Sequence, residues 1–267
     1  MKARSRLYRI EGIVLSRRDQ GEADRVVRML TADGIVDLLA KGIRKPHSRK
    51  AGHLELFSRS QVLASRVKNS WDILSQAEAL MVRRHLQEDF ERATYARYIA
   101  ELVIRFFEGE TDLQLYHFVD QTFAHLEEVA EPMRFVRWVE PRLLTLAGFR
   151  PTWDACVGER EGALCEAELH PQPTDRRPYG IDPAHGGALC PDCFKANREM
   201  RAVQQLSPSA LSWLQAFQRR EYEDVRQYDF PAQTAAELSH VMEHYIVYHL
   251  EWRPAILTLM QELGRRE

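Results

Sequence analysis

The sequence has few cysteines and no long apolar segment. Only four of its 267 residues are cysteine, too few for the disulfide-dense scaffold of a small secreted protein. No apolar run approaches the roughly 18 residues that a transmembrane helix needs. The segment 1–6 is basic, but no unbroken apolar stretch follows it, so a secretory signal is not expected. These absences favour a cytoplasmic protein with no membrane partner.

The sequence also lacks the short motifs of common nucleotide-binding and hydrolytic enzymes. It contains no P-loop, no Gly-x-Gly-x-x-Gly and no Gly-x-Ser-x-Gly. His240 and His244 match the His-x-x-Glu-His pattern of some zinc peptidases, but the short stretch after His244 leaves little room for a further acidic ligand. A polar helix face is the favoured interpretation, and a hydrolase using His240 and His244 is a minor alternative. We therefore expect no enzymatic activity and no small-molecule substrate.

Charge is distributed unevenly along the chain. The formal net charge is −2, but residues 1–80 carry 16 Lys and Arg against 9 Asp and Glu, whereas residues 81–267 carry 21 against 30. A basic first part of this kind points to a polyanionic partner. The densest run, residues 41–50, has five basic residues and no acidic one. Gly42 and Pro46 make it a loop, which can follow a phosphate backbone but does not present a fixed array to base edges.

The segment 1–80 shows the pattern of short β-strands. Asp33-Gly34 between two apolar runs predicts a hairpin. Five or six short strands in a segment of this length are typical of a small barrel, and the OB-fold, a five-stranded barrel that binds oligonucleotides, fits this number. The predicted strands are residues 8–15, 25–30, 35–40, 55–57, 61–65 and 72–76.

Beyond residue 80 the apolar period becomes helical. Gly148 is placed to end one of these helices, and Pro141 within the same stripe predicts a kink or two shorter helices. Ser207-Pro208 predicts the start of another, and the last helix should stop before Pro254. The apolar stripes lie at residues 95–106, 113–126, 135–146, 211–217 and 238–248.

All four cysteines, Cys156, Cys165, Cys190 and Cys193, fall in a loop-rich insert at residues 150–195, which also holds six of the twelve prolines. The two residues between Cys190 and Cys193 allow both thiolates to face one ion, so the set predicts a structural, four-thiolate Zn²⁺ site that catalyses nothing. The separation of Cys156 from Cys165 is wider than usual. An incomplete metal site and a redox role therefore remain alternatives.

The order of these parts resembles the RecO family of bacterial DNA repair and recombination mediators. The resemblance runs in order along nearly the whole chain. The segments that carry it are Tyr8–Leu15, Gly21–Arg25, Leu30–Gly34, Ala40–Pro46, Gly52–Phe57, Leu146–Pro151, Gly186–Cys190 and Tyr248–Leu250.

The resemblance implies an α+β fold with an N-terminal five-stranded OB-fold β-barrel, followed by an α-helical domain with a zinc-finger-like insert. The barrel would occupy residues 1–80, the helical domain 81–267, and the insert 150–195. Many family members have Cys-x-x-Cys where this chain has Cys156 to Glu159, so Cys165 would take the place of the second cysteine.

The resemblance also implies a function. The family binds single- and double-stranded DNA, anneals complementary strands, and helps load recombinase onto strands coated by single-strand binding protein. It works with RecR in the RecF pathway, in the bacterial cytoplasm in association with the nucleoid. The alternative hypothesis is a zinc-containing adaptor whose basic half binds RNA or an acidic protein.

Candidate binding residues follow from these patterns. The segment 1–80 contains only three aromatic residues, Tyr8, Phe57 and Trp71, all of which could belong to the core, so we expect contacts dominated by backbone charge. The family's docking of the acidic, apolar-ended tail of single-strand binding protein makes Tyr245, His249 and Arg253 candidates for partner binding. The predicted DNA-binding residues are Arg17, Arg18, Arg25, Arg28, Lys41, Arg44, Lys45, Arg49 and Lys50.

Overall fold

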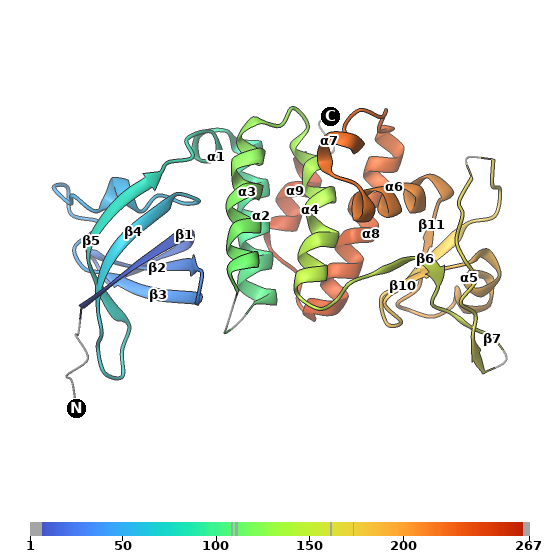
Figure 1. Ribbon diagram of the computed structural model, residues 1–267, viewed down its shortest axis with the longest axis horizontal. Helices are drawn as coiled ribbons and strands as arrows, with labels where there is room; N and C mark the ends of the chain where they lie inside the picture. The colour runs from blue at the N-terminus through green and yellow to red at the C-terminus, as the bar shows by residue number, and fades with distance from the viewer. Residues whose placement is uncertain (1–6, 108, 110–111, 161, 173, 264–267) are drawn as a thin grey trace. The chain divides into compact units, whose positions relative to one another are not determined.

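The computed structural model describes residues 7–107, 109, 112–160, 162–172 and 174–263. The chain forms two compact units, residues 1–132 and 133–267. The first contains a β-barrel and three α-helices, and the second contains further helices and a small sheet (Figure 1). The α+β fold class is therefore confirmed. No helix in the described part of the chain is long and apolar enough to span a membrane.

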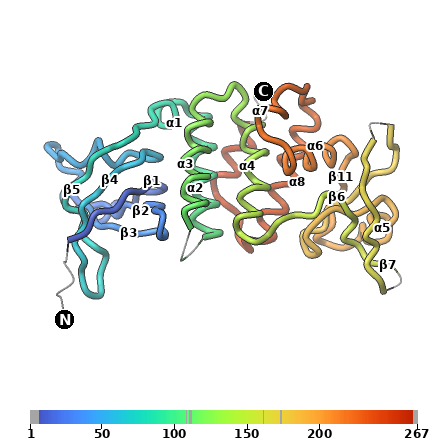
Figure 2. The backbone as a smooth tube through the Cα atoms, in the orientation of Figure 1, coloured from blue at the N-terminus to red at the C-terminus, as the bar shows by residue number. Residues whose placement is uncertain are grey.

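The first unit begins with the expected five-stranded barrel, closed in the order β1-β2-β3-β5-β4. The long strand β1 pairs with a different strand along each half: residues 7–13 pair with β4, and residues 13–20 pair with β2 (Figure 2). β3 and β5 are parallel and pair through only two residues of each strand. The strands are β1 (Leu7–Gln20), β2 (Asp24–Thr31), β3 (Gly34–Ala40), β4 (Arg59–Ser65) and β5 (Asp72–Met81).

Alternation along each strand places one set of apolar side chains inside the barrel, because successive strand residues face opposite sides. Every strand contributes to the resulting buried cluster. Its strand members include Val14, Val27, Leu38, Val62 and Leu74. The opposite face is mixed: it carries charged side chains such as Arg28, and also Ile13, Leu15 and Leu30, which are buried.

The predicted strand at residues 55–57 is wrong. Phe57 has a φ of 65°, in the left-handed region, which is incompatible with an extended strand. Its backbone N–H donates to the carbonyl of Val14, and its buried ring lies 5.2 Å from that of Phe123, centroid to centroid. The segment thus turns inward to fix the barrel to a helix and adds no strand.

Three helices complete this unit: α1 (His85–Glu88), α2 (Phe90–Phe106) and α3 (Leu113–Glu128). The Asp89 and Asp112 side chains cap the N-termini of α2 and α3, as aspartate commonly does. The buried Arg83 guanidinium donates to the carbonyl of Phe57 and to the carboxylate of Asp120 on α3. A buried cation that lost this carboxylate would be strongly unfavourable, so the pair holds α3 against the barrel.

In the second unit, α4 (Pro132–Leu146) starts at the proline and ends before Gly148, whose φ is 83°, as predicted. α4 continues as one helix through Pro141, so the proline does not divide the segment into two shorter helices. Pro254 was expected to follow the last helix, yet α9 (Ile256–Leu263) comes after it. The remaining helices of this unit in the described residues are α6 (Pro208–Arg219), α7 (Tyr222–Val225) and α8 (Ala232–Leu250). Ser207 caps the N-terminus of α6, as predicted.

The segment 150–206 contains more regular structure than the predicted loop-rich insert. A four-stranded sheet has the order β11-β9-β10-β6, and β7 and β8 form a separate hairpin. The predicted domain boundary at residue 80 stays a prediction. The elements are β6 (Thr152–Cys156), β7 (Glu159–Arg160), β8 (Ala163–Leu164), β9 (Tyr179–Asp182), β10 (Gly187–Leu189), α5 (Pro191–Asn197) and β11 (Gln204–Leu206).

Candidate nucleic-acid interface and metal centre

The basic loop, residues 41–50, connects β3 toward β4 and is fixed at both ends. Near its start, the backbone N–H of Gly42 donates to the Asp24 carboxylate at 2.7 Å, and Gly42 has a φ of 63° that favours glycine. At its end, Lys50 Nζ donates to the carbonyls of Lys41 at 2.8 Å and Leu74 at 3.4 Å. The loop is therefore anchored to the barrel on which it lies.

This anchoring compensates for the short pairing of β3 with β5. Beyond the two paired residues, β5 meets the segment that follows β3: its Leu74 carbonyl accepts from Lys50, and the N–H of Ala79 donates to His53 Nδ1 at 3.2 Å. Burial lowers the pKa of Lys50 from its usual value. Lys50, predicted to contact DNA, thus has a structural role in closing the barrel.

Four of the predicted DNA-binding arginines pair with carboxylates. The closest pairs are Arg17 with Glu55 at 2.7 Å and Arg28 with Asp37 at 2.7 Å. Asp19 receives both Arg25, at 2.8 Å, and Arg44, at 3.4 Å. The hydrogen bond from Arg25 lowers the pKa of Asp19, so this carboxylate is charged at neutral pH. A phosphate approaching these arginines must compete with a carboxylate already in place.

The remaining predicted cations present their charge to solvent. Lys41, Lys45 and Arg49 are exposed and have no ion pair within the part of the chain that the structure describes. Arg18 is also exposed, and its guanidinium lies 5.6 Å from the centre of the Trp71 ring. The structure therefore separates the nine predicted residues into paired arginines, one structural lysine, and four accessible cations.

Arg9 was not among the predicted DNA-binding residues. It lies on the outer face of β1 and, with Arg49, Lys50 and His53, lines a groove of about 410 Å³. The floor of this groove includes Leu63, which is paired in register with Arg9. The signal was present in the sequence, because alternation with Tyr8 and Ile10, which pack against the barrel core, assigns Arg9 to the outer face.

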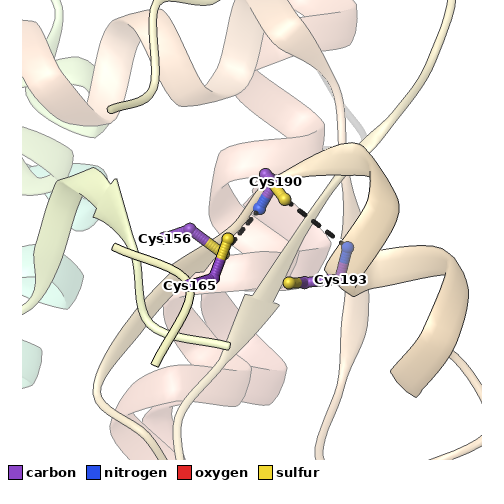
Figure 3. Close-up of side chains that lie close together, drawn as sticks. All are labelled: Cys156, Cys165, Cys190 and Cys193. Carbon is purple, nitrogen blue, oxygen red and sulfur yellow. Dashed lines mark hydrogen bonds between the residues drawn. The ribbon is translucent and has the colours of Figure 1, made fainter. Parts of the chain in front are cut away.

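The four cysteines converge as predicted. Cys156 ends β6, Cys165 follows β8, Cys190 is the N-cap of α5, and Cys193 lies in its first turn (Figure 3). Their sulfur atoms all lie within 4.8 Å of one another. Four thiolates bound to one zinc at about 2.3 Å would be about 3.8 Å apart, so a small contraction gives tetrahedral coordination.

The β7–β8 hairpin explains how Cys165 reaches the cluster despite its wide spacing from Cys156. The hairpin turns the chain back so that the N–H of Cys165 donates to the Gly158 carbonyl at 2.8 Å. Gly158 packs against Cys193: a Cβ added at this glycine would lie only 2.8 Å from the Cys193 Cβ. The residues between Cys156 and Cys165 therefore form a hairpin that leaves the four-thiol geometry intact.

The polar surroundings of the cluster favour the thiolate at one cysteine, Cys190. Arg160 donates to Cys190 Sγ at 3.0 Å and to Cys193 Sγ at 3.2 Å. Burial raises the pKa of Cys190, but hydrogen bonds from the N–H of Cys193 and from neighbouring thiols outweigh it and bring that pKa down to about 7. Burial raises the pKa of Cys156 to about 12 and also raises the pKa of Cys193. A divalent cation would offset this by favouring the thiolate form.

Comparison with known proteins agrees with this architecture. The family model for the recombination protein O N-terminal region matches residues 3–83, and that for its C-terminal region matches residues 87–255. The chain belongs to the RecO family. It is 33% identical over 261 residues to the DNA repair protein RecO of a Roseiflexus species, covering 97% of this chain and 87% of the relative. The RecO protein of Symbiobacterium thermophilum is 32% identical, with coverage of 92% and 94%.

All three candidate partner-binding residues make contacts within the second unit. Tyr245 is buried, with its ring 5.5 Å from that of Trp153 and 4.6 Å from that of His249. Arg253 is paired with the Glu243 carboxylate. His249 is partly buried, and burial lowers the pKa of its imidazole. Of this set, Tyr245 contributes to the core, and the assignment of the others to partner binding stays a prediction.

The structure also gives no support to a hydrolytic site at His240 and His244. His244 Nε2 lies 2.8 Å from the Ala202 carbonyl oxygen, and Glu243 pairs with Arg253. The four-cysteine cluster is the metal-ligand group found among the described residues. The His-x-x-Glu-His spacing is therefore explained by ordinary helix contacts.

We predict that Lys50 and Lys45 have separable roles. Lys50→Met should lower the free energy of unfolding by about 1 kcal/mol, because two backbone carbonyls lose a donor. Lys45→Met, at an exposed position, should change it by less than about 0.5 kcal/mol but should weaken DNA binding. Urea denaturation followed by circular dichroism and fluorescence anisotropy with labelled DNA provide the two measurements. The assignment fails if Lys50→Met retains full stability and loses DNA affinity.

Proposed function

We propose that this chain is a non-enzymatic DNA-binding mediator that anneals complementary single strands in DNA repair. The anchored basic loop is the main support, because it presents Lys41, Lys45 and Arg49 without intramolecular ion pairs in the described structure. The family membership and the OB-fold barrel support it. Phosphate contacts by lysine and arginine give affinity without base readout.

Annealing is consistent with this type of contact. Two complementary strands repel each other through their phosphates, and cations held at a protein surface reduce that repulsion. Because the loop cations do not grip base edges, the bases of both strands stay free to pair. Cooperation with RecR, and loading of recombinase onto strands coated by single-strand binding protein, are parts of the same proposal. So are a cytoplasmic location and association with the nucleoid.

We further propose that the four cysteines hold a structural Zn²⁺. The donors fit the ion: four thiols converge from three chain segments, Cys190 has a lowered pKa, and Arg160 donates to two sulfur atoms. Bound zinc would link β6, the β7–β8 hairpin and α5. With all four coordination positions filled by protein, such a site contributes folding energy.

The DNA-binding proposal predicts different effects for unpaired and paired cations. A variant carrying Lys41→Gln, Lys45→Gln and Arg49→Gln should bind single-stranded and duplex DNA about ten- to a hundredfold more weakly, because three phosphate contacts are lost. The slope of log affinity against log salt should fall by about three. The same variant should also anneal strands coated by single-strand binding protein more slowly. Anisotropy titrations at several salt concentrations and a fluorescence annealing assay measure these effects.

The matched control removes the same charge from paired arginines. Arg25→Gln, Arg28→Gln and Arg226→Gln each remove an arginine that pairs with a carboxylate. We expect this control to retain most of its affinity. Equal losses in both variants would show that net charge alone governs binding and would contradict the role of the loop. Tighter binding to structured RNA than to DNA would instead favour the adaptor hypothesis.

The zinc proposal predicts that Cys165 is required for metal binding. Purified protein should contain one zinc per chain by mass spectrometry of metals, and Cys165→Ser should bind zinc more than about 100-fold more weakly because one ligand is lost. The melting temperature of the variant should fall accordingly. Glu159→Ala, an exposed change in the same hairpin, should retain the metal. Full zinc content in Cys165→Ser would exclude a four-thiolate site.

A further inference from the structure

Two of the three aromatic rings in the barrel are partly exposed, and each lies beneath an arginine. Phe57 is buried, but Tyr8 and Trp71 are only partly buried. The guanidinium carbon of Arg66 lies 5.3 Å from the centre of the Tyr8 ring, and that of Arg18 lies 5.6 Å from the centre of the Trp71 ring. Both distances fall within the range of a cation–π contact.

Asp72 joins these two pairs into one structure. Its carboxylate accepts from the Tyr8 hydroxyl at 2.5 Å and from the backbone N–H of Val67 at 2.9 Å. Burial and this hydrogen bond raise the pKa of Tyr8 to about 12, so the phenol remains protonated and continues to donate. One carboxylate therefore holds the Tyr8 ring and the β4–β5 loop, and that loop ends at Trp71, the residue before Asp72.

The β4–β5 loop, residues 66–71, adds charge at the same end of the barrel. It contains Arg66 and Lys68 and no acidic residue, and both side chains are exposed. Neither has an ion pair in the described part of the structure. In OB-folds the loop between the fourth and fifth strands is one of the places where oligonucleotides bind.

Proteins bind single-stranded nucleic acid with aromatic rings that lie beside cations free of ion pairs. An aromatic ring or a guanidinium plane offers a stacking surface to any base, and adjacent cations hold the neighbouring phosphates. A duplex cannot use such a surface, because its bases are already stacked on one another. The arrangement therefore distinguishes an unpaired strand from a duplex, which the basic loop alone does not do.

We propose that Trp71 with Arg18 and Tyr8 with Arg66 form a base-stacking platform that recognises unpaired DNA strands. This platform rests on the proposed DNA-binding function and adds a preference for single strands to it. A base stacks on the outer face of the Arg18–Trp71 pair, while Arg66 and Lys68 contact flanking phosphates. The basic loop supplies affinity common to both forms of DNA.

The test compares single-stranded and duplex DNA of equal length with the full chain. Trp71→Ala should weaken binding to an oligothymidylate about tenfold, the usual effect of losing one stacked base, and should change duplex affinity less than about twofold. Its salt dependence should stay that of the wild type, because no charge is removed. Trp71→Phe should retain most of the single-strand affinity, since a ring remains.

Two outcomes would overturn the platform. Equal losses on both DNA forms would assign Trp71 to barrel stability, and an unchanged single-strand affinity would show that no base stacks there.

A strand with abasic positions gives a second measurement that leaves the protein intact. We expect the wild type to bind it about tenfold more weakly than oligothymidylate, and equal affinity for both would also overturn the proposal. Wild-type protein that binds neither DNA form would instead defeat the proposed function itself.

Discussion

The first unit depends on how its barrel closes between β3 and β5. These strands pair through two residues each, and beyond them β5 is bonded at Leu74 and Ala79 to the segment that follows β3. The ammonium group of Lys50 and the imidazole of His53 make the closing hydrogen bonds. A loop that would otherwise be a solvated connection is thereby held on the barrel, and Lys41, Lys45 and Arg49 stay exposed on it. The barrel geometry and the placement of positive charge are consequences of the same contacts.

The same constraint divides the cations of the first unit by availability. Strand arginines lie beside carboxylates that the barrel brings close, as Arg17 lies beside Glu55. Exposed ion pairs of this kind add little stability, but they lower the local positive potential that a phosphate would meet. Lys41 and Lys45 of the loop, and the arginines that lie over the partly exposed rings, have no carboxylate partner among the described residues. The number of basic side chains in the segment 1–80 is therefore larger than the number of cations that are available to bind DNA.

Local patterns predicted much of this molecule, and long-range contacts account for what they missed. Alternation predicted the barrel strands. The hairpin marked by Asp33-Gly34, which turns at Ala32 and Asp33, and the caps at Ser207 and Gly148 were visible in the sequence, and the cysteines were correctly grouped. The strand at residues 55–57 failed because Phe57 turns inward to meet Phe123, on a helix far along the chain. Pairing of arginines could not be predicted for a similar reason, since their partners depend on strand register and tertiary contact. The hairpin that returns Cys165 to its cluster was likewise invisible in the spacing alone.

The basic loop is assigned both a structural lysine, Lys50, and DNA-binding lysines, Lys41 and Lys45. Acetylation of surface amines, followed by peptide mass spectrometry with and without DNA, tests this assignment directly. We expect Lys41 and Lys45 to react quickly in the free protein and to be protected by DNA, whereas Lys50 reacts slowly in both states. Protection of Lys50 with no change at Lys41 and Lys45 would contradict this account of the interface.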